Sequence, residues 1–277
     1  MTQERSAIEL VDAGDGRRLD RFGDHLVDRP APGAAAPARL PAAAWATADL
    51  RFERGRGWEG GSREPWTVDV DGLTLELRPT DAGQVGLFPE HVALWAWLRR
   101  ALAGRPEPHV LHLFAHTGAT TLALAHAGAR VTHVDASRPA LAWARRNAEL
   151  SGLADAPVRW IIDDALAFTR REARRGRRYA GIVLDPPSFG HGPRGTRWEL
   201  ADALPDLLDA CAAVARDDVF LLLTAHTTGL EPDALADALG DAFDPGPGGE
   251  LAADRLDERA TSGAILPLGA GARMIRG

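Results

Sequence analysis

Aspartates at the ends of apolar segments are the residues of this sequence best suited to do chemistry. They are Asp135 after Arg130–Val134, Asp163 and Asp164 after Val158–Ile162, and Asp185 after Gly181–Leu184. If these segments are parallel strands, their carboxyl ends meet at one edge of a sheet, where open α/β sheets bind nucleotides. Asp135 could then accept hydrogen bonds from both ribose hydroxyls, and Asp164 could accept one from the exocyclic amine of an adenine. Asp164 could equally cap a helix that starts at Ala165.

A turn of mostly small residues follows another apolar segment, Val110–Phe114. The turn reads FAHTG and holds one glycine, Gly118, whereas a dinucleotide site uses G-x-G-x-x-G to bring the backbone close to a pyrophosphate. Phe114 and His116 stand where that motif needs small residues. This favours a ligand without phosphate, such as S-adenosylmethionine. The alternative is that Gly118 only forms a turn and Asp135 only caps the next helix.

The segment DPPSF, which begins at Asp185, follows the fourth apolar segment of the alternating region. Its two prolines fix the backbone and remove two amide donors, which leaves carbonyl groups and the Asp185 carboxylate as acceptors. Such acceptors could hold a planar amine with its lone pair toward a methyl donor, and Phe189 could stack on that acceptor. We therefore take Asp185, Pro186, Ser188 and Phe189 as the candidate catalytic residues. The alternative is a rigid turn without a role in catalysis.

Two histidines and an arginine cluster are weaker candidates. His226, in TAHTTG after the fifth apolar segment, could act as a base, but a lone histidine is more often structural. His116 could line the cofactor site. The cluster Arg170–Arg178 could contact phosphates, yet arginines are also favourable at the C-terminal end of a helix. We interpret the cluster as a solvated helix end.

The rest of the sequence supplies the elements that must hold these residues. From Val110 onward apolar segments alternate with helical ones, and Glu250–Arg276 could supply two last strands, so we predict a doubly wound α/β sheet. Alternation in Trp66–Leu77 around Asp71–Gly72 predicts a β-hairpin. Pro89 could start one helix that carries Val92, Trp95, Leu98 and Leu102 on one face. Residues 1–60 show little periodicity. We therefore predict an N-terminal extension with a β-hairpin over residues 1–85 and a main domain over residues 86–277.

Composition limits the cellular setting and the function classes. The chain has 277 residues, a net charge of −7 and one cysteine, Cys211, which excludes an internal disulfide and favours the reducing cytoplasm. We expect neither a signal peptide nor a membrane span. The acidic balance disfavours a nucleic-acid partner only weakly, because all 32 basic residues are arginines. Patterns typical of zinc proteases and P-loop NTPases are absent, and no metal is expected.

Three long segments resemble one known family. Leu111–Leu153, Trp160–Phe168 and Gly181–Cys211 resemble class I S-adenosylmethionine-dependent methyltransferases, of the group that contains bacterial 23S ribosomal RNA base methyltransferases. The resemblance extends from Gly14–Pro32 to Ser262–Pro267 and is greatest to a short subgroup without an RNA-binding PUA domain. It implies a Rossmann-like, mostly parallel seven-stranded sheet, a methyl acceptor near Asp185–Phe189, and S-adenosylmethionine as cofactor. The implied cofactor-binding residues are Phe114, Ala115, His116, Thr117, Gly118, Asp135, Ala136, Ser137, Asp163, Asp164, Ala165 and Asp185.

Departures from the family pattern bear on the substrate. Members that make 5-methylcytosine resemble this chain but carry a nucleophilic cysteine where it reads TAHTTG, and Cys211 is predicted to lie inside a helix. Residues 82–85 also lack the aromatic and the cation that the subgroup carries there, which suggests a changed substrate pocket. We predict methyl transfer to nitrogen or oxygen of an RNA base, with a small planar molecule as the alternative acceptor. A non-catalytic cofactor-binding protein is the least favoured alternative, and a homodimer is left open.

Overall fold

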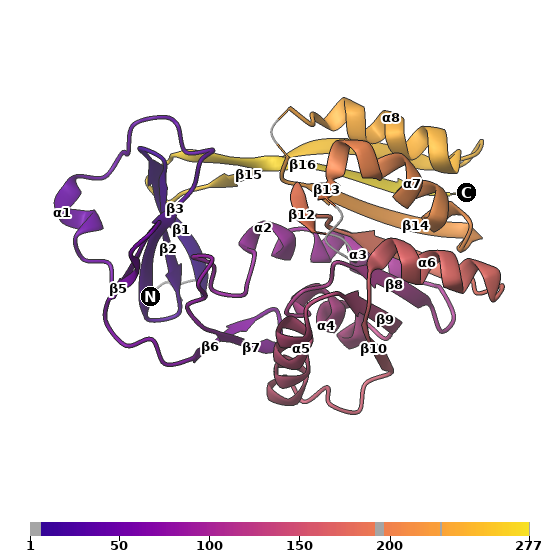
Figure 1. Cartoon of the computed structure of the whole chain (residues 1–277), viewed down its shortest axis with the longest axis horizontal. Helices are drawn as coiled ribbons and strands as arrows, with labels where there is room; N and C mark the ends of the chain where they lie inside the picture. The colour runs from indigo at the N-terminus through magenta and orange to yellow at the C-terminus, as the bar shows by residue number, and fades with distance from the viewer. Residues whose placement is uncertain (1–6, 192–196, 228, 277) are drawn as a thin grey trace. The chain divides into compact units, whose positions relative to one another are not determined.

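The computed structural model describes residues 7–191, 197–227 and 229–276. The chain divides into two compact units (Figure 1). Unit 1 comprises Met1–Ala93, Arg146–Ser151 and Asp257–Leu268, and unit 2 comprises Leu94–Arg145, Gly152–Leu256 and Gly269–Gly277. The boundary between residues 85 and 86 stays a prediction.

Most of a seven-stranded sheet with the order β10-β9-β8-β11-β14-β16-β15 lies in unit 2, whereas the end of β15 and the start of β16, within residues 257–268, belong to unit 1. The strands of this sheet are β8 (His109–Leu113), β9 (Arg130–Asp135), β10 (Val158–Ile162), β11 (Tyr179–Leu184), β14 (Ala215–Ala225), β15 (Glu250–Arg259) and β16 (Ile265–Ile275). The pairs from β10 through β14 are parallel, and β16 is antiparallel to β14. The order reverses between β8 and β11, which makes this the topological switch point. The predicted doubly wound, mostly parallel seven-stranded sheet is confirmed.

The sheet of unit 2 is covered by helices because its central strands are apolar on both faces. All six residues of β11 are buried, as expected for a strand covered on both sides. The helices are α3 (Trp95–Leu102), α4 (Ala119–His126), α5 (Arg138–Leu150), α6 (Ala165–Arg174), α7 (Leu200–Ala212) and α8 (Pro232–Phe243). Leu113 and Ile182 of the sheet share a core with Phe168, Leu207 and Leu239 of α6, α7 and α8. Helices therefore hold the carboxyl ends of the strands in place.

Unit 1 contains a five-stranded sheet that the sequence interpretation missed. Its strands, in the order β1 to β5 across the sheet, are β1 (Ile8–Gly14), β2 (Arg17–Phe22), β3 (His25–Pro30), β4 (Leu50–Glu53) and β5 (Gly57–Gly60). Helix α1 (Ala42–Trp45) lies between β3 and β4 in the chain. Residues 1–60 show little apolar periodicity because these strands bury charge: Asp20 is 0% exposed and accepts hydrogen bonds from Arg18 and Arg29. In β2 and β3 these buried ion pairs lie among buried apolar residues such as Leu19, Phe22 and Val27, which interrupts the apolar pattern.

The segment between the two sheets agrees in part with the prediction. The hairpin is confirmed as β6 (Trp66–Val70) and β7 (Leu73–Leu77). The single helix expected from Pro89 is wrong, because α2 (Pro89–Val92) ends before α3 begins at Trp95. A short sheet of β12 (Phe189–His191) and β13 (Arg197–Glu199) was not predicted. Among the described residues, no helix is both long enough and apolar enough to cross a membrane.

Candidate active site

The predicted site residues gather at the carboxyl edge of the sheet in unit 2. Residues predicted to bind the cofactor follow β8, β9 and β10, and those predicted to act on the acceptor follow β11. These strands are parallel neighbours, so their carboxyl ends lie side by side (Figure 1). The segments are thus parallel strands whose carboxyl ends meet at one edge, as the sequence prediction required. The ligand assigned to each residue stays a prediction.

The turn after β8 has an unusual backbone. Phe114, His116 and Gly118 all have positive φ angles, of 56°, 48° and 81°. For a residue other than glycine this conformation costs about 1–3 kcal/mol and is found mostly at functional sites. The turn keeps it through backbone hydrogen bonds, in which Ala115 N donates to Val134 O at 3.1 Å and Gly118 N donates to Ala115 O at 3.0 Å.

These hydrogen bonds limit what the turn can bind. The amides of Ala115, His116 and Gly118 all donate within the protein, so they do not form the row of donors that a pyrophosphate needs. A Cβ on Gly118 would lie 2.8 Å from the Cβ of Ala144 in α5. Glycine is therefore required here both for φ and for close packing of helix against turn. Ala115 and Thr117 are buried beside it.

Asp135 is held at the edge by two backbone amides. Its Oδ2 accepts from His116 N at 2.7 Å, and its Oδ1 accepts from Ser137 N at 2.8 Å. Helix α5 is capped by Ser137, whose Oγ accepts from Ala140 N at 3.2 Å. A carboxylate offers about four acceptor positions, so each oxygen of Asp135 can accept one more hydrogen bond. Asp135 is half-buried, whereas Ala136 and Ser137 are exposed.

Asp163 and Asp164 have structural partners. Asp164 Oδ1 accepts from Ala167 N at 2.8 Å and caps α6, so the capping alternative is confirmed and a contact with adenine stays a prediction. Asp163 forms an ion pair with Arg171, and its Oδ1 accepts from Asp164 N at 2.9 Å. Ala165 is buried at the first position of α6.

Asp185 meets two residues from the end of β14. Thr224 Oγ1 donates to Asp185 Oδ1 at 2.6 Å, and His226 Nε2 lies 3.4 Å from the same oxygen. The sequence interpretation favoured a structural role for His226 and did not consider Thr224. The only available signal was their position at the end of the fifth strand of an α/β sheet. The Thr224 hydrogen bond holds the Asp185 carboxylate in one orientation, and the His226 ring lies beside it.

The other residues of DPPSF differ in their surroundings. Phe189 is 63% exposed, as a stacking surface must be, and Pro186 is buried. Ser188 Oγ lies 2.8 Å from Thr227 Oγ1. The Pro187 carbonyl, one of the predicted acceptors, already accepts from Trp198 Nε1 at 2.7 Å. Trp198 is a second residue that sequence reasoning missed, and its ring lies 5.7 Å from that of Phe114.

A buried polar chain lies beneath the site. Thr121 Oγ1 in α4 is 2.7 Å from His112 Nδ1 in β8 and 2.9 Å from His133 Nδ1 in β9. Burial, followed by the charges of His112 and His116, places the pKa of His133 well below its ordinary value. His133 therefore stays neutral while it links β9 to the helix that follows the turn.

Known proteins resemble this chain over different lengths. No family profile matches it. The structure of the SAM-dependent methyltransferase from Agrobacterium tumefaciens is 36% identical, covers 99% of this chain and 92% of that chain, and has a TM-score of 0.92. The ribosomal RNA large subunit methyltransferase K/L of Stutzerimonas stutzeri (strain A1501) is 38% identical over 128 residues, which is 46% of this chain and 17% of that protein. The chain thus spans about a fifth of the length of the curated relatives it matches.

A more distant solved structure shares the fold. The 16S rRNA N2 G1207 methyltransferase of T. thermophilus, in complex with AdoMet and guanosine, is 19% identical, covers 77% of this chain and 50% of that chain, and has a TM-score of 0.51. Identity and mutual coverage are far higher for the Agrobacterium tumefaciens protein. On that basis, and as the sequence predicted, the chain belongs to the S-adenosylmethionine-dependent methyltransferases.

Proposed function

We propose that this protein transfers a methyl group from S-adenosylmethionine to a nitrogen or oxygen of a planar acceptor, and that the acceptor is a base of the large ribosomal RNA, such as a 23S guanine. The observation that carries the proposal is the Asp185 carboxylate, oriented by Thr224 at the same sheet edge as the turn after β8. Relatives named ribosomal RNA large subunit methyltransferases align with about half of the chain, which supports RNA as the substrate class. Location in the cytoplasm stays a prediction, and a homodimer stays open.

The turn after β8 and Asp135 would hold the cofactor. Asp135 can accept two more hydrogen bonds, the number that the two ribose hydroxyls donate. The turn amides are engaged within the protein, which suits a cofactor without phosphate. When bound, S-adenosylmethionine supplies a methyl group on a positively charged sulfur. The residues of this chain would then hold the acceptor in line with that methyl group.

Asp185 would position the acceptor. Its carboxylate accepts a hydrogen bond from an N–H of a planar amine, so that the nitrogen lone pair points toward the methyl group. Thr224 fixes the carboxylate orientation, and correct orientation is the main contribution that such a site makes to rate. Exposed Phe189 stacks on the flat face of the base. In this proposal His226, 3.4 Å from Asp185, takes the proton that the amine loses.

Cofactor binding tests the role of Asp135. We expect Asp135→Ala to weaken S-adenosylmethionine binding about a hundredfold by calorimetry, because two hydrogen bonds to a charged acceptor are lost. Asp155→Ala, which removes an exposed aspartate in the loop before β10, is the matched control. Equal affinities of the two variants would remove Asp135 from the cofactor site.

Turnover tests the role of Asp185. Asp185→Asn keeps the size and one oxygen of the side chain, so it should retain cofactor binding by calorimetry, including the contact predicted for Asp185, but lose methyl transfer to ribosomal RNA from a strain that lacks the gene. Nucleoside mass spectrometry of that RNA, before and after incubation with the parent protein, identifies the modified base. Full transfer by Asp185→Asn would exclude its positioning role. If the strain that lacks the gene is missing a methyl group on a small metabolite while its RNA is unchanged, the small-molecule alternative is favoured.

A further inference from the structure

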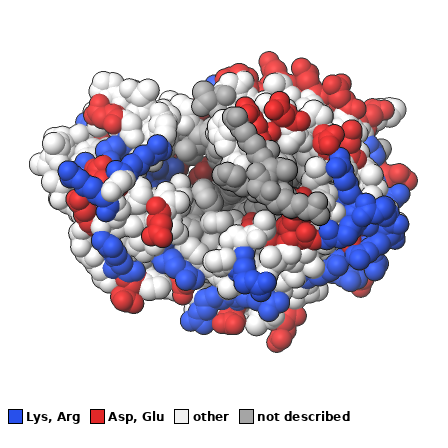
Figure 2. All heavy atoms as spheres, viewed as in Figure 1, with Lys and Arg blue, Asp and Glu red and all other residues white. Residues whose placement is uncertain are grey.

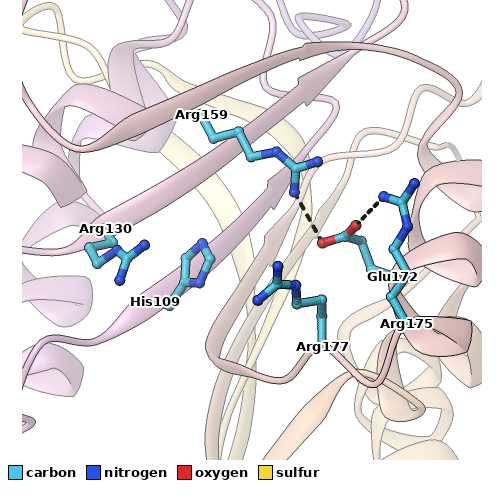
Figure 3. Close-up of a pocket in the computed structure, with 6 residues that line it drawn as sticks. All are labelled: His109, Arg130, Arg159, Glu172, Arg175 and Arg177. Atoms are coloured by element: carbon cyan, nitrogen blue, oxygen red, sulfur yellow. Dashed lines mark hydrogen bonds and ion pairs between the residues drawn. The ribbon is translucent and has the colours of Figure 1, made fainter.

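A pocket lies at the other edge of the same sheet, opposite the candidate active site. Its volume is about 390 Å³, and it is lined by His109, Arg130, Arg159, Glu172, Arg175 and Arg177 (Figure 3). His109 and Arg130 are the first residues of β8 and β9, and Arg159 is the second residue of β10. Arg175 and Arg177 precede β11. The pocket is therefore at the amino ends of the strands, whereas the candidate active site is at their carboxyl ends.

One buried carboxylate organises this pocket. Glu172 is 1% exposed, and it accepts hydrogen bonds from Arg159 and Arg175, both at 3.1 Å, and from Tyr179 Oη at 2.8 Å. Burial alone would raise the pKa of Glu172, but these hydrogen bonds and the nearby Arg159 charge keep that pKa below its ordinary value. Glu172 therefore stays charged and fixes two guanidinium groups at the pocket wall (Figure 3).

The remaining positive charge of the pocket is not neutralised by the described part of the protein. Four arginines face one glutamate, which leaves a formal charge of +3. Within the described residues, Arg130 and Arg177 form no ion pair. His109 does not offset the excess: burial, then the charges of Arg130 and Arg159, lower its pKa, so it is neutral at pH 7. The pocket thus presents guanidinium groups without matching anions.

Phosphate is the anion that this arrangement fits. Guanidinium groups bind phosphate oxygens through paired N–H donors, and two of the four are already held in place by Glu172. Arg174 and Arg178, both exposed, extend the positive surface beyond the pocket. Figure 2 shows this gathering of arginines on the side of unit 2 where Figure 1 shows α6. A phosphate chain that continues across the surface would use the pocket and its surroundings together.

We propose that this pocket binds backbone phosphates of an RNA strand, at a site separate from the one that would hold the base to be methylated. The inference rests on the proposed function for the identity of the polymer, but not for the phosphate chemistry. It also changes the interpretation of Arg170–Arg178 as a solvated helix end, because Arg175 and Arg177 line the pocket. Arg170 and Arg171 instead pair with Asp206 and Asp163.

The first test uses inorganic pyrophosphate and does not depend on methyl transfer. We expect pyrophosphate to raise the pKa of His109, measured by NMR of its imidazole, because a bound anion offsets the arginine charges. The double variant Arg130→Ser/Arg177→Ser keeps the Glu172 network and should lose this response. Arg54→Ser/Arg56→Ser, which removes two exposed arginines of unit 1, should keep it. An unchanged His109 pKa in the parent would overturn the phosphate site.

The second test identifies the source of the phosphate. We measure the affinity for an RNA oligonucleotide at several salt concentrations. Arg130→Ser/Arg177→Ser should reduce the magnitude of the slope of log affinity against log salt by about 2, which is about 1 for each phosphate contact. Its cofactor affinity, measured by calorimetry, should be unchanged. Equal slopes for the parent, the pocket variant and the control would overturn RNA binding at the pocket. If Arg130→Ser/Arg177→Ser loses pyrophosphate binding but binds RNA like the parent, RNA binding at the pocket is also overturned, and a small phosphate compound becomes the favoured ligand. Failure of methyl transfer alone would refute the proposed function and not this pocket.

Discussion

Acidification should destabilise this protein through one buried histidine. His133 is 0% exposed, and its Nε2 has no hydrogen-bond partner among the described residues. A protonated ring would carry an N–H there without an acceptor, and burial already places the pKa of His133 well below the ordinary 6.5. The unfolded chain binds this proton below pH 6.5 and the folded chain does not. Stability from this group is therefore complete above pH 6.5 and is lost as the pH falls.

The expected loss follows from proton linkage. Between pH 7.5 and pH 5 a histidine that titrates only in the unfolded state lowers the free energy of unfolding by about 2 kcal/mol. Urea unfolding at both pH values should show that the free energy of unfolding of His133→Asn falls by about 2 kcal/mol less than that of the parent. Asn can still hydrogen-bond Thr121, and it does not titrate here. The lowered pKa of His109 adds to the loss in both proteins.

The decisive quantity is how much the free energy of unfolding changes between pH 7.5 and pH 5, and not its absolute value at either pH. His126→Asn removes an exposed histidine from the end of α4 and controls for any effect of losing an imidazole irrespective of burial. The reasoning would be wrong if His133→Asn and the parent lost the same free energy between pH 7.5 and pH 5.

Three further outcomes are expected. Gly118→Ala should lower the free energy of unfolding by about 1–3 kcal/mol and weaken cofactor binding. Gly128→Ala is the control, because Gly128 also has a positive φ but its added Cβ meets no heavy atom within 4 Å. Equal cofactor affinities of the two variants would contradict this prediction. Asp20→Ala should cost about 3–5 kcal/mol in chemical denaturation, because two buried arginines lose their carboxylate, whereas Asp24→Ala at an exposed site should cost little. Burial raises the pKa of Cys211 to about 12, so iodoacetamide at pH 8 should label it only after unfolding, and rapid labelling of the native protein would refute its burial.

Local sequence was enough for the main sheet and for where its site residues lie. Gly181–Leu184 is apolar throughout because strand β11 is covered on both faces, and such a segment can be recognised without knowing its neighbours. Asp135 and Asp185 could be placed at one edge because parallel strands end on the same side. Capping by Asp164 follows from the residue type and its position before a helix. In each case a few consecutive residues contain the whole signal.

The first sheet could not be predicted in this way. In β2 and β3 the buried positions include Arg18, Asp20 and Arg29, which a polarity pattern assigns to the surface. Their burial is tolerable only because each meets an opposite charge from another strand or a distant segment, such as Glu258. Arg18 and Asp20 are two positions apart in β2, but their other partners, Glu258 and Arg29, lie on other strands, and such pairings leave no local signal.

The sequence by itself determined the alternating strands and helices of the main sheet from Val110 onward, the methyltransferase family and the set of acidic residues at one sheet edge. Only the tertiary structure decided that Thr224 and His226 meet Asp185, 39 and 41 positions earlier in the chain, and that Phe114 and His116 take a left-handed backbone without being glycine. It alone also gathered four arginines around Glu172. The reason is physical: burial of a segment is encoded in its own side chains, whereas convergence of side chains depends on strand register and crossovers, which involve the whole chain.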